Sequence, residues 1–438
     1  MSDASDKDKG FDILIKAGGR ALALRFFLLW VTVTLAHTVL LVGRIAYDPI
    51  IIHAELIPYC SFSIMVFLEW LLLRRRTLTS DVRIFEIITF LVGIGIAMQF
   101  RMGTFDYGAS LGFMLALPIG LASMLAIHLI AADGRWKHLS KIGYIFYAAA
   151  VSLLLAMLVF GRKYRGGIYL PGNVNPSEIV KLFLVIFLSS FLSNRKKELS
   201  STFLGFPIPR FSSFLLLAIL WLIPVALVMA LHDLGLILLL NAVLVIMLYA
   251  ATRSLGYLIL GGIGVVGAGY LLQTLSSHVH ARFSAWLNPF ADPTGSGWQI
   301  LQSLSAMYAG GIWGAGIGAG SPSAIPIVTT DFVYAAIAEE LGLVICALLI
   351  VLFGCLFVRG FRAAGRTDNP FGKLLATGLT AALAVQTILN IGGVVKAVPL
   401  TGIVLPFLSQ GGSGLIAMLA MAGLLAAIST GELQKNKK

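Results

Sequence analysis

Residues 213–252 read SFLLLAILWLIPVALVMALHDLGLILLLNAVLVIMLYAAT, two apolar runs separated by little more than His232 and Asp233. Each run approaches the ~20 residues that an α-helix needs to cross a bilayer. The stretch therefore predicts two membrane-spanning helices joined by a tight turn. Asp233 has two interpretations: a cap on the helix that follows it, which is the commoner arrangement, or an acidic group placed for binding.

Similar runs recur along the whole chain, whose 438 residues are 58% hydrophobic and 12% charged. Such a composition excludes an ordinary soluble domain, because too little polar surface is present to cover one. We expect an all-α polytopic membrane protein with about twelve transmembrane helices. The expected helices lie at residues 22–43, 51–73, 84–100, 109–131, 142–160, 178–193, 213–231, 234–252, 254–275, 333–357, 375–395 and 413–429.

The distribution of Lys and Arg predicts the orientation. When the first helix starts in the cytoplasm, 23 of the 32 basic residues fall in inner segments. Membrane proteins concentrate these residues on the cytoplasmic side, so both termini are expected there. Residues 276–332 then form the largest extracytoplasmic loop. The asymmetry also explains the net charge of +12 without any nucleic-acid partner.

Basic residues on the outer side run against this rule, so each is a candidate for binding an anion. They are Arg44, Arg101, Arg162, Lys163, Arg165, Arg282 and Lys396. We expect Arg44 and Arg101 to contact lipid phosphates. The "GRKYR" cluster that contains Arg165, together with Arg282 and Lys396, lies beside unusual polar motifs, which favours a functional role.

The segment NPSEIVK (residues 175–181) places two opposite charges inside an apolar run. Pro176 is typical of a helix start. Glu178 and Lys181 are three residues apart on one helical face, where they can pair and cancel charge. The pair either locks two helices together or faces a substrate, and the residues alone leave both alternatives open.

A second acidic motif, TTDFVYAAIAEELG (residues 329–342), has Asp331 at a helix entrance and two adjacent glutamates further in. Adjacent side chains on a helix point about 100° apart, so only one glutamate is expected to face a cavity. Glu339 is our candidate. Its burial requires a partner or a raised pKa, which favours a functional assignment.

The segment VVKAVPLTGIVLPFLSQGGSGL (residues 394–415) is apolar but rich in Pro and Gly, which excludes a regular helix. We expect it to dip into the membrane, where irregular backbone must line a cavity or be buried in protein. Ser409 and Ser413, with Gln410, would supply its polar contacts. A different glycine-rich stretch, GGIWGAGIGAG (residues 310–320), lacks the flanking residues of a phosphate-binding loop.

The outer loop contains NPFADPTGSGWQILQS (residues 288–303), and Asp292 is the only carboxylate from 276 to 330. Asp292 either forms a turn ahead of Pro293 or acts as a general base beside an anionic substrate, and these interpretations have equal weight. From Trp298 the spacing predicts a helix. Candidate substrate contacts on one face of it are Gln299, Gln302 and Ser303.

Five ordered motifs resemble those of the SEDS family of bacterial cell-wall polymerases, whose members include FtsW, RodA and SpoVE. They are NPSEIVK, HDLG, RFSAWLNPFADPTGSGWQILQS, TTDFVYAAIAEELG and PLTGIVLPFLSQGGSGL. The resemblance implies a ten-helix core over 84–430 with its outer loop at 276–332. Residues 21–83 would be an additional hairpin, and 1–20 and 431–438 cytoplasmic tails.

The resemblance also implies an activity: peptidoglycan glycosyltransfer, polymerising lipid II into glycan strands at the outer face of the bacterial cytoplasmic membrane. Asp292 matches the family's catalytic aspartate. We expect substrate contacts from Arg165, Glu178, Lys181, Asp233, Arg282, Gln299, Gln302, Ser303, Asp331, Glu339, Lys396, Ser409 and Ser413. Expected partners are a class B penicillin-binding protein transpeptidase, other elongation or divisome proteins, and membrane lipids. No cofactor is firmly implied, and a divalent cation (Mg²⁺ or Mn²⁺) stays open.

One departure concerns "YRGGIYLPGN", where Gly166 and Gly167 stand near the place of the family's Arg-Trp pair. It leaves the donor or acceptor surface open to change. Two alternative functions remain: a flippase for lipid-linked precursors, which requires access from both sides, and a scaffold without activity that recruits a transpeptidase. Whether the protein serves elongation, division or sporulation is not readable from the residues.

Overall fold

The computed structural model describes residues 21, 23–36, 38, 52–76, 81–102, 111–132, 134–164, 167–171, 175–203, 206–207, 209–275 and 277–433. Within these ranges the protein is almost entirely helical, as predicted. Besides a helix over 23–36, its helices are α2 (Ile52–Arg76), α3 (Val82–Arg101), α4 (Leu111–Ala131), η2 (Arg135–Ile142), α5 (Gly143–Phe160), α6 (Ser177–Asn194), α7 (Lys196–Leu199), α8 (Phe211–Ala230), α9 (Leu234–Thr252), α10 (Leu255–Leu275), α11 (Ser277–Leu287), η3 (Pro289–Ala291), α12 (Trp298–Gly310), η4 (Pro322–Ala324), α13 (Val333–Arg366), α14 (Pro370–Val394) and α15 (Gly412–Leu433).

Every apolar run predicted from the sequence overlaps one of these helices. Eight of the described helices are long and apolar enough to cross a membrane, and shorter apolar helices cover Ala23–Ala36, Pro58–Leu71, Leu115–Ala131 and Leu255–Tyr270. Two small antiparallel hairpins complete the fold. In one, β1 (Arg162–Tyr164) pairs with β2 (Gly167–Tyr169); in the other, β3 (Thr202–Phe203) pairs with β4 (Phe206–Pro207).

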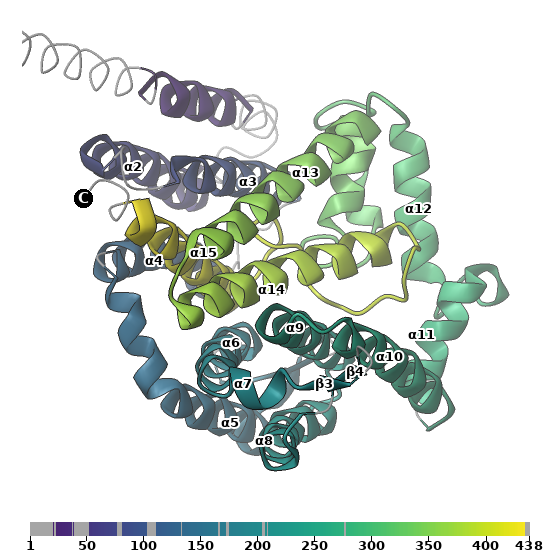
Figure 1. Ribbon diagram of the computed structural model, residues 1–438. Coiled ribbons are helices and arrows are strands. Elements are labelled where there is room, and N and C mark those ends of the chain that lie inside the picture. Colours follow the sequence, from purple (N-terminus) through teal and green to yellow (C-terminus); the bar gives the residue numbers. More distant parts are fainter. Residues whose placement is uncertain are drawn as a thin grey trace, which may run out of the picture.

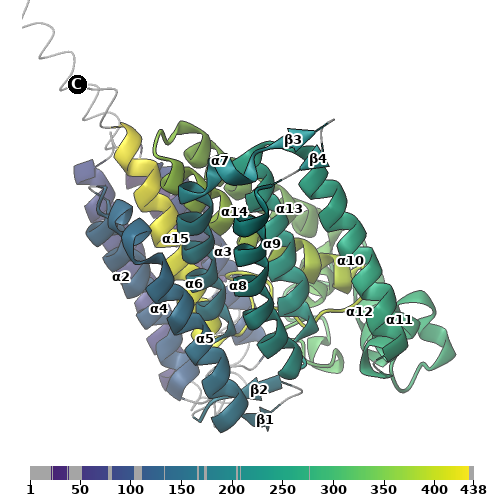
Figure 2. The ribbon, with the colours of Figure 1, turned by 60° about the horizontal axis from the view of Figure 1, so that its bottom comes forward.

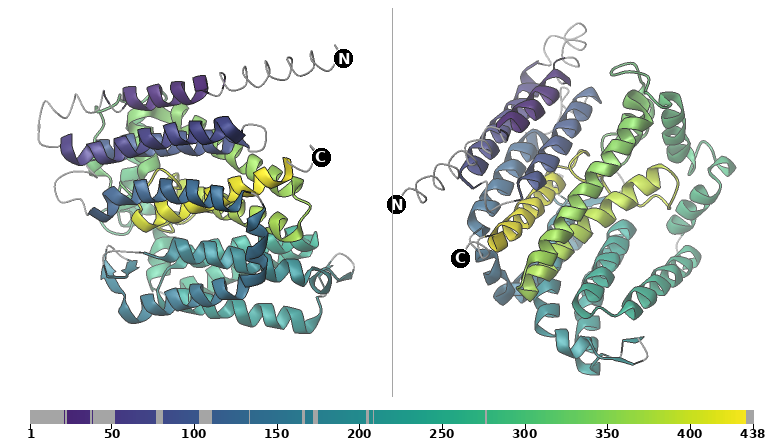
Figure 3. Two further views of the ribbon diagram at one scale, coloured as in Figure 1. Left: turned by 90° about the vertical axis from the view of Figure 1, so that its left-hand side faces the viewer. Right: turned by 45° about the horizontal axis from the view of Figure 1, so that its top comes forward.

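The helices form a bundle with α14 and α15 at its centre (Figure 1). α15 packs against α4, and α14 packs against α13, α6 and α9. The two hairpins mark opposite ends of the bundle (Figure 2). The helix over 23–36 lies at the edge beside α2 (Figure 3), and the Trp30 indole donates a hydrogen bond to the Ser63 hydroxyl across that contact.

Large apolar side chains remain exposed on the bundle's flank, for example Ile145 and Phe160 on α5 and Phe211 and Leu222 on α8. Water would disfavour such a surface, whereas lipid tails would not. The exposed flank therefore agrees with a membrane-spanning fold.

Local sequence signals explain several helix boundaries. Asp233 caps α9 as predicted, because its Oδ1 accepts a hydrogen bond from the Leu236 amide at 3.0 Å. α6 begins at Ser177, directly after Pro176. There the Ser177 amide donates to the side-chain oxygen of Asn175.

α13 differs from the prediction, which ended this helix at residue 357. It extends to Arg366 and contains a break at Gly342, whose φ of 80° and ψ of 174° are not helical. A residue with a side chain adopts such a conformation only with strain. The break lies two residues beyond Glu340, in the motif that the sequence had marked as unusual.

Candidate functional site

The predicted pair of Glu178 and Lys181 is present near the start of α6. The Lys181 Nζ lies 2.5 Å from a carboxylate oxygen of Glu178, and the lysine side chain is almost completely buried. Gln386 of α14 joins them: its Oε1 accepts a hydrogen bond from Lys181 at 2.5 Å, and its Nε2 lies 3.4 Å from Glu178. The two charges thus neutralise one another inside the bundle, and a buried amide adds hydrogen bonds to both.

The irregular segment between α14 and α15, residues 395–411, is held by buried amide side chains. Gln386 and Asn390 of α14 donate to the carbonyls of Val404 and Ile403, at 3.0 and 2.7 Å. Gln99 of α3 donates to the Leu408 carbonyl at 3.0 Å. Residues 405–409 are buried, which fits the prediction that irregular backbone here lines a cavity or is buried in protein. We call residues 395–411 the re-entrant segment.

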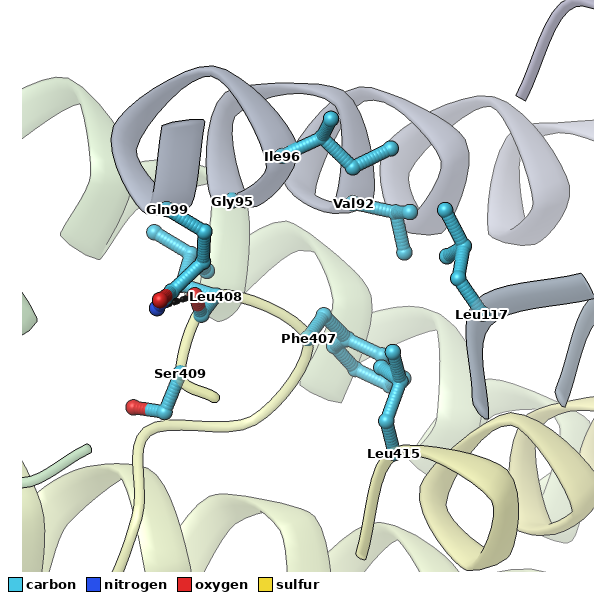
Figure 4. Close-up of a pocket in the computed structure, with 9 residues that line it drawn as sticks. All are labelled: Val92, Gly95, Ile96, Gln99, Leu117, Phe407, Leu408, Ser409 and Leu415. Atoms are coloured by element: carbon cyan, nitrogen blue, oxygen red, sulfur yellow. Dashed lines mark hydrogen bonds between the residues drawn. The ribbon is translucent and has the colours of Figure 1, made fainter. Parts of the chain in front are cut away.

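A small pocket lies between α3, α4, the re-entrant segment and the start of α15 (Figure 4). Its lining is apolar apart from Gln99 and Ser409. The Ser409 hydroxyl donates to the Thr330 carbonyl at 2.5 Å. Ser409 thereby ties the re-entrant segment to the residues that precede α13.

Ser413 has a backbone partner as well. Its hydroxyl donates to the Asn175 carbonyl at 2.6 Å and accepts from the Asn175 amide at 3.1 Å. This contact joins the start of α15 to the start of α6, two elements that the motifs had marked separately.

Arg282 of α11 lies where several elements meet. Its Nη1 donates to the carbonyl of Thr401 in the re-entrant segment at 3.2 Å, and it interacts electrostatically with both Asp233 and Asp331. Asp233 in turn interacts electrostatically with Glu178 and Lys181. The structure therefore brings the predicted residues of four separate motifs into one cluster of charges, which we call the charged cluster.

Burial governs the ionisation of this cluster. Burial raises the pKa of Asp233 above its ordinary value, and the hydrogen bond from the Leu236 amide opposes that shift. Burial also raises the pKa of Asp331, whereas the hydrogen bond from the Thr330 hydroxyl and the charge of Arg282 lower it. The pKa of Arg282 is lowered by burial, while the two aspartates oppose the change. At each of these groups the effect of burial exceeds that of the opposing hydrogen bonds and charges.

Asp292 lies apart from the hydrogen bonds of this cluster, in an exposed turn. Its two carboxylate oxygens accept hydrogen bonds from the amides of Gly295 at 3.1 Å and Ser296 at 2.7 Å. The bonds from Ser296 are the main reason that the pKa of Asp292 is lowered. The turn-forming interpretation is therefore realised, and the same contacts hold an ionised carboxylate at the entrance of α12.

The predicted helix from Trp298 is confirmed as α12. Gln299 and Gln302 are half-buried on it. Ser303 is completely buried, and its hydroxyl donates to the Val394 carbonyl at 3.1 Å. Ser303 therefore attaches α12 to the end of α14.

Lys396, in the re-entrant segment, contacts the end of α11. Its Nζ lies 3.4 Å from the Leu287 carbonyl, and its own carbonyl accepts from the Trp286 indole at 3.1 Å. Arg165 and Gly166 lie outside the described residues. Gly167 opens β2.

One prediction about the outer side was wrong. Arg101 does not project toward lipid phosphates: its Nε lies 2.8 Å from the Glu340 carboxylate, and its Nη2 donates to the carbonyls of Gly318 and Gly320. Arg44, for which the same contact was expected, lies outside the described residues. Glu339 and Glu340 are both buried, because the chain at 318–321 wraps across both. That only one of them faces a cavity stays a prediction.

The hydrogen bonds of these glutamates lead to that same stretch of chain. Glu339 accepts from the Ser321 amide at 2.8 Å, and Glu340 accepts from the Gly318 amide at 3.2 Å. Both glutamates thus have protein partners that a helical wheel could not show, since the partners are distant in sequence.

The buried amides were missed by the sequence reasoning. Gln99, Gln386 and Asn390 each interrupt an otherwise apolar helix, and that was the available signal. For metals, the described part of the chain contains no group of three His, Cys, Asp or Glu side chains able to hold one ion.

The fold and the charged cluster define a multi-pass α-helical membrane protein with a polar site at one end of its bundle. Residues 75–434 match the FtsW, RodA and SpoVE family of cell cycle proteins, and the chain belongs to that family. The resemblance drawn from the five motifs is therefore confirmed.

Individual relatives agree. The chain is 35% identical over 379 residues to a protein of Mycobacterium tuberculosis named peptidoglycan glycosyltransferase RodA, covering 82% of this chain and 80% of that protein. It is 36% identical over 264 residues to stage V sporulation protein E of Bacillus subtilis, covering 59% of this chain and 69% of the relative.

Solved structures share the fold. One chain from a peptidoglycan synthase complex that coordinates polymerization and crosslinking matches with a TM-score of 0.63 and 25% identity, covering 80% of this chain and 97% of that one. The crystal structure of the rod shape determining protein RodA of Thermus thermophilus matches with a TM-score of 0.58 and 24% identity, covering 81% and 97%.

Proposed function

We propose that this protein is a peptidoglycan glycosyltransferase that polymerises lipid II into glycan strands at the outer face of the bacterial cytoplasmic membrane. Family membership and the names of the relatives support the activity. The observation that carries the proposal within this chain is the charged cluster of Glu178, Lys181, Asp233, Arg282 and Asp331, gathered where α6, α9 and α13 begin. A substrate with a diphosphate between a lipid and a sugar requires such a site at the bilayer surface.

The reaction assigns distinct roles to the acid and to the cations. Asp292 accepts the proton of the acceptor sugar's hydroxyl while that oxygen attacks the anomeric carbon of the donor. The bond between this carbon and the diphosphate oxygen breaks, and the lipid diphosphate leaves with the bonding electrons. Arg282 and Lys396, with Arg165, would stabilise its negative charge.

The turn around Asp292 keeps its carboxylate ionised, since two backbone amides donate to it. A carboxylate stabilised in this way is a weak base toward a free hydroxyl. The hydroxyl becomes strongly acidic, however, as its bond to the anomeric carbon forms. Proton transfer late in the reaction is therefore compatible with the lowered pKa of Asp292.

The proposal includes the expected surroundings of the enzyme. Both termini would lie in the cytoplasm, and a class B penicillin-binding protein transpeptidase would crosslink the new strands. The match to a chain of a synthase complex supports such a partner.

A flippase is the second candidate for this architecture, because it would also carry buried charges. Transport across the bilayer requires binding groups accessible from both sides in turn. The charged cluster instead joins the starts of α6, α9 and α13 at one end, which favours an enzyme working on one side.

The test compares two substitutions of one residue. Asparagine also forms this kind of turn, so Asp292→Asn keeps the turn and removes the base, whereas Asp292→Ala removes both. With purified lipid II, alone and with the transpeptidase, both variants should lose roughly 10²–10⁴-fold in polymerisation rate. Ser296→Ala, which keeps the backbone donor to Asp292, is the matched control and should remain active.

The outcomes separate the alternatives. An active Asp292→Asn beside an inactive Asp292→Ala would restrict Asp292 to turn formation. A wild-type protein that moves lipid II across vesicle membranes without polymerising it would support the flippase. A wild-type protein that does neither, yet stimulates the transpeptidase, would support the scaffold.

A further inference from the structure

The break in α13 is filled by another part of the chain. We call residues 311–320 the glycine loop. Its amides at Ala315 and Gly316 donate hydrogen bonds to the carbonyls of Glu339 and Glu340, at 2.8 and 3.0 Å. Beyond the break at Gly342, two amides of α13 donate in turn to carbonyls of the loop. The glycine loop thus supplies the backbone partners that the helix loses at its break.

Side chains fasten the same loop to α3 and α13. Arg101 donates hydrogen bonds to the carbonyls of Gly318 and Gly320. The Glu340 carboxylate forms an ion pair with Arg101 and accepts a hydrogen bond from the Gly318 amide. Glu339 receives the amide of Ser321, just beyond the loop. These side-chain contacts, together with the backbone hydrogen bonds to α13, hold the glycine loop, whose ten residues form neither helix nor strand.

A loop held so firmly nevertheless exposes large apolar side chains. Tyr308, in the last turn of α12, is 90% exposed, and Trp313 is 81% exposed. Ile312 and Ile317 are 61% and 46% exposed. Residues 293–330 contain no charged side chain at all. Exposed apolar side chains this close together in the chain, with no charge among them, indicate contact with a lipid or protein partner.

The position of the loop along α13 favours lipid. At the opposite end of this helix, Arg359 pairs with Asp81 at the start of α3, and exposed Arg362 and Arg366 follow. Because exposed charges are costly in hydrocarbon, we place one edge of the core near Arg359. Gly342 lies about 25 Å from Arg359 at ~1.5 Å per residue. The hydrocarbon core is ~30 Å thick, so the break and the paired loop lie at the opposite edge of the core. Trp and Tyr prefer that depth in membrane proteins.

We propose that the glycine loop and the last turn of α12 together form a membrane anchor. In this anchor, Tyr308 of α12 and Ile312, Trp313 and Ile317 of the loop insert into the headgroup region of the adjacent leaflet. The ligand is a phospholipid surface. Because the loop follows α12 directly and is attached to α13, the anchor fixes the position of α12 relative to the bilayer surface. Figure 2 shows α11 and α12 beside the bundle rather than beyond its end. The anchor does not depend on the proposed activity.

An environment-sensitive fluorophore on a single cysteine measures this insertion. Cys60, Cys346 and Cys355 are first replaced by alanine. Trp313→Cys then receives the label, and the protein is reconstituted without partners into phosphatidylethanolamine and phosphatidylglycerol vesicles whose acyl chains are brominated. The matched control is Ser296→Cys, in the exposed turn of the same outer loop. Quenching should be several-fold stronger at 313 than at 296, with emission at shorter wavelength.

Equal emission and equal quenching at the two positions would overturn the proposal. So would a label at 313 that is exposed to water in vesicles and becomes shielded only when a transpeptidase is added, because the surface would then bind protein. Should the cysteine-free chain not fold, intrinsic fluorescence answers the same question. The Trp136 indole is buried at the opposite end of the bundle. Trp313→Phe should therefore remove more of the tryptophan fluorescence that bromine quenches than Trp136→Phe does.

Discussion

Replacing Lys181 by methionine would leave Glu178 with a charge and without its closest partner. The two side chains are 2.5 Å apart, and the lysine is 1% exposed against 16% for the glutamate. Gln386 would keep its hydrogen bond to the Val404 carbonyl but could not neutralise a carboxylate. The reverse change, Glu178→Gln, would leave the buried ammonium of Lys181 facing only neutral amides.

The magnitude follows from this geometry. Two unit charges at 2.5 Å attract by about 7 kcal/mol at an effective dielectric constant of about 20. Desolvation of both groups offsets much of that attraction in the intact pair. Removing one partner leaves the other charge buried without compensation, which typically costs ~3–5 kcal/mol. Domains are stable by only ~5–15 kcal/mol, so each single variant should lose a large share of its stability.

The double variant Glu178→Gln/Lys181→Met is the decisive comparison, because it removes both charges together. Equilibrium unfolding in mixed micelles with increasing dodecyl sulfate gives the free energy for all four proteins. We expect the double variant to recover most of the loss, with a coupling energy of at least ~2 kcal/mol. Two additive single losses would refute the pairing argument.

The same variants separate the two roles that the sequence left open. A double variant that folds and polymerises lipid II would make the pair an architectural lock. A double variant that folds and does not polymerise would place the pair in contact with substrate. Either result is readable because folding and activity are measured on one preparation.

Two further predictions follow from the break in α13 and from the charge asymmetry. Gly342→Ala should destabilise the protein by ~1–3 kcal/mol, because φ is +80° there and an added carbon would meet the glycine loop; Gly354→Ala, in open space on the same helix, should be neutral or slightly stabilising in the same dodecyl sulfate titration. In intact cells, cysteines placed at Ser277 and Ser200 should differ, with an impermeant maleimide labelling only the first, and the reverse pattern would contradict the topology.

Local features of this protein were readable from its sequence. Long apolar runs predicted the helices because crossing a bilayer requires about 20 apolar residues. The pair of Glu178 and Lys181, the cap at Asp233 and the start of α12 at Trp298 were readable because each depends on residues within one helical turn of one another. Local geometry is nearly independent of the rest of the fold.

The partners of distant residues were not readable. Arg101 and Glu340 are more than two hundred positions apart in the chain, and Gln386 contacts Lys181 from another helix. In a soluble helix, the polar face would have shown which side turns inward. In a membrane, the lipid-facing and the buried sides are both largely apolar. Isolated polar residues such as Gln386 can mark a buried side, but only packing decides which helices meet.

The break at Gly342 shows the same division. The sequence contained the glycine, but a glycine inside an apolar run is also compatible with an unbroken helix. Only the tertiary structure brings the glycine loop to α13, where its backbone replaces the lost helical hydrogen bonds. The helix can open at that point because the partners for its amides and carbonyls come from residues about thirty positions earlier.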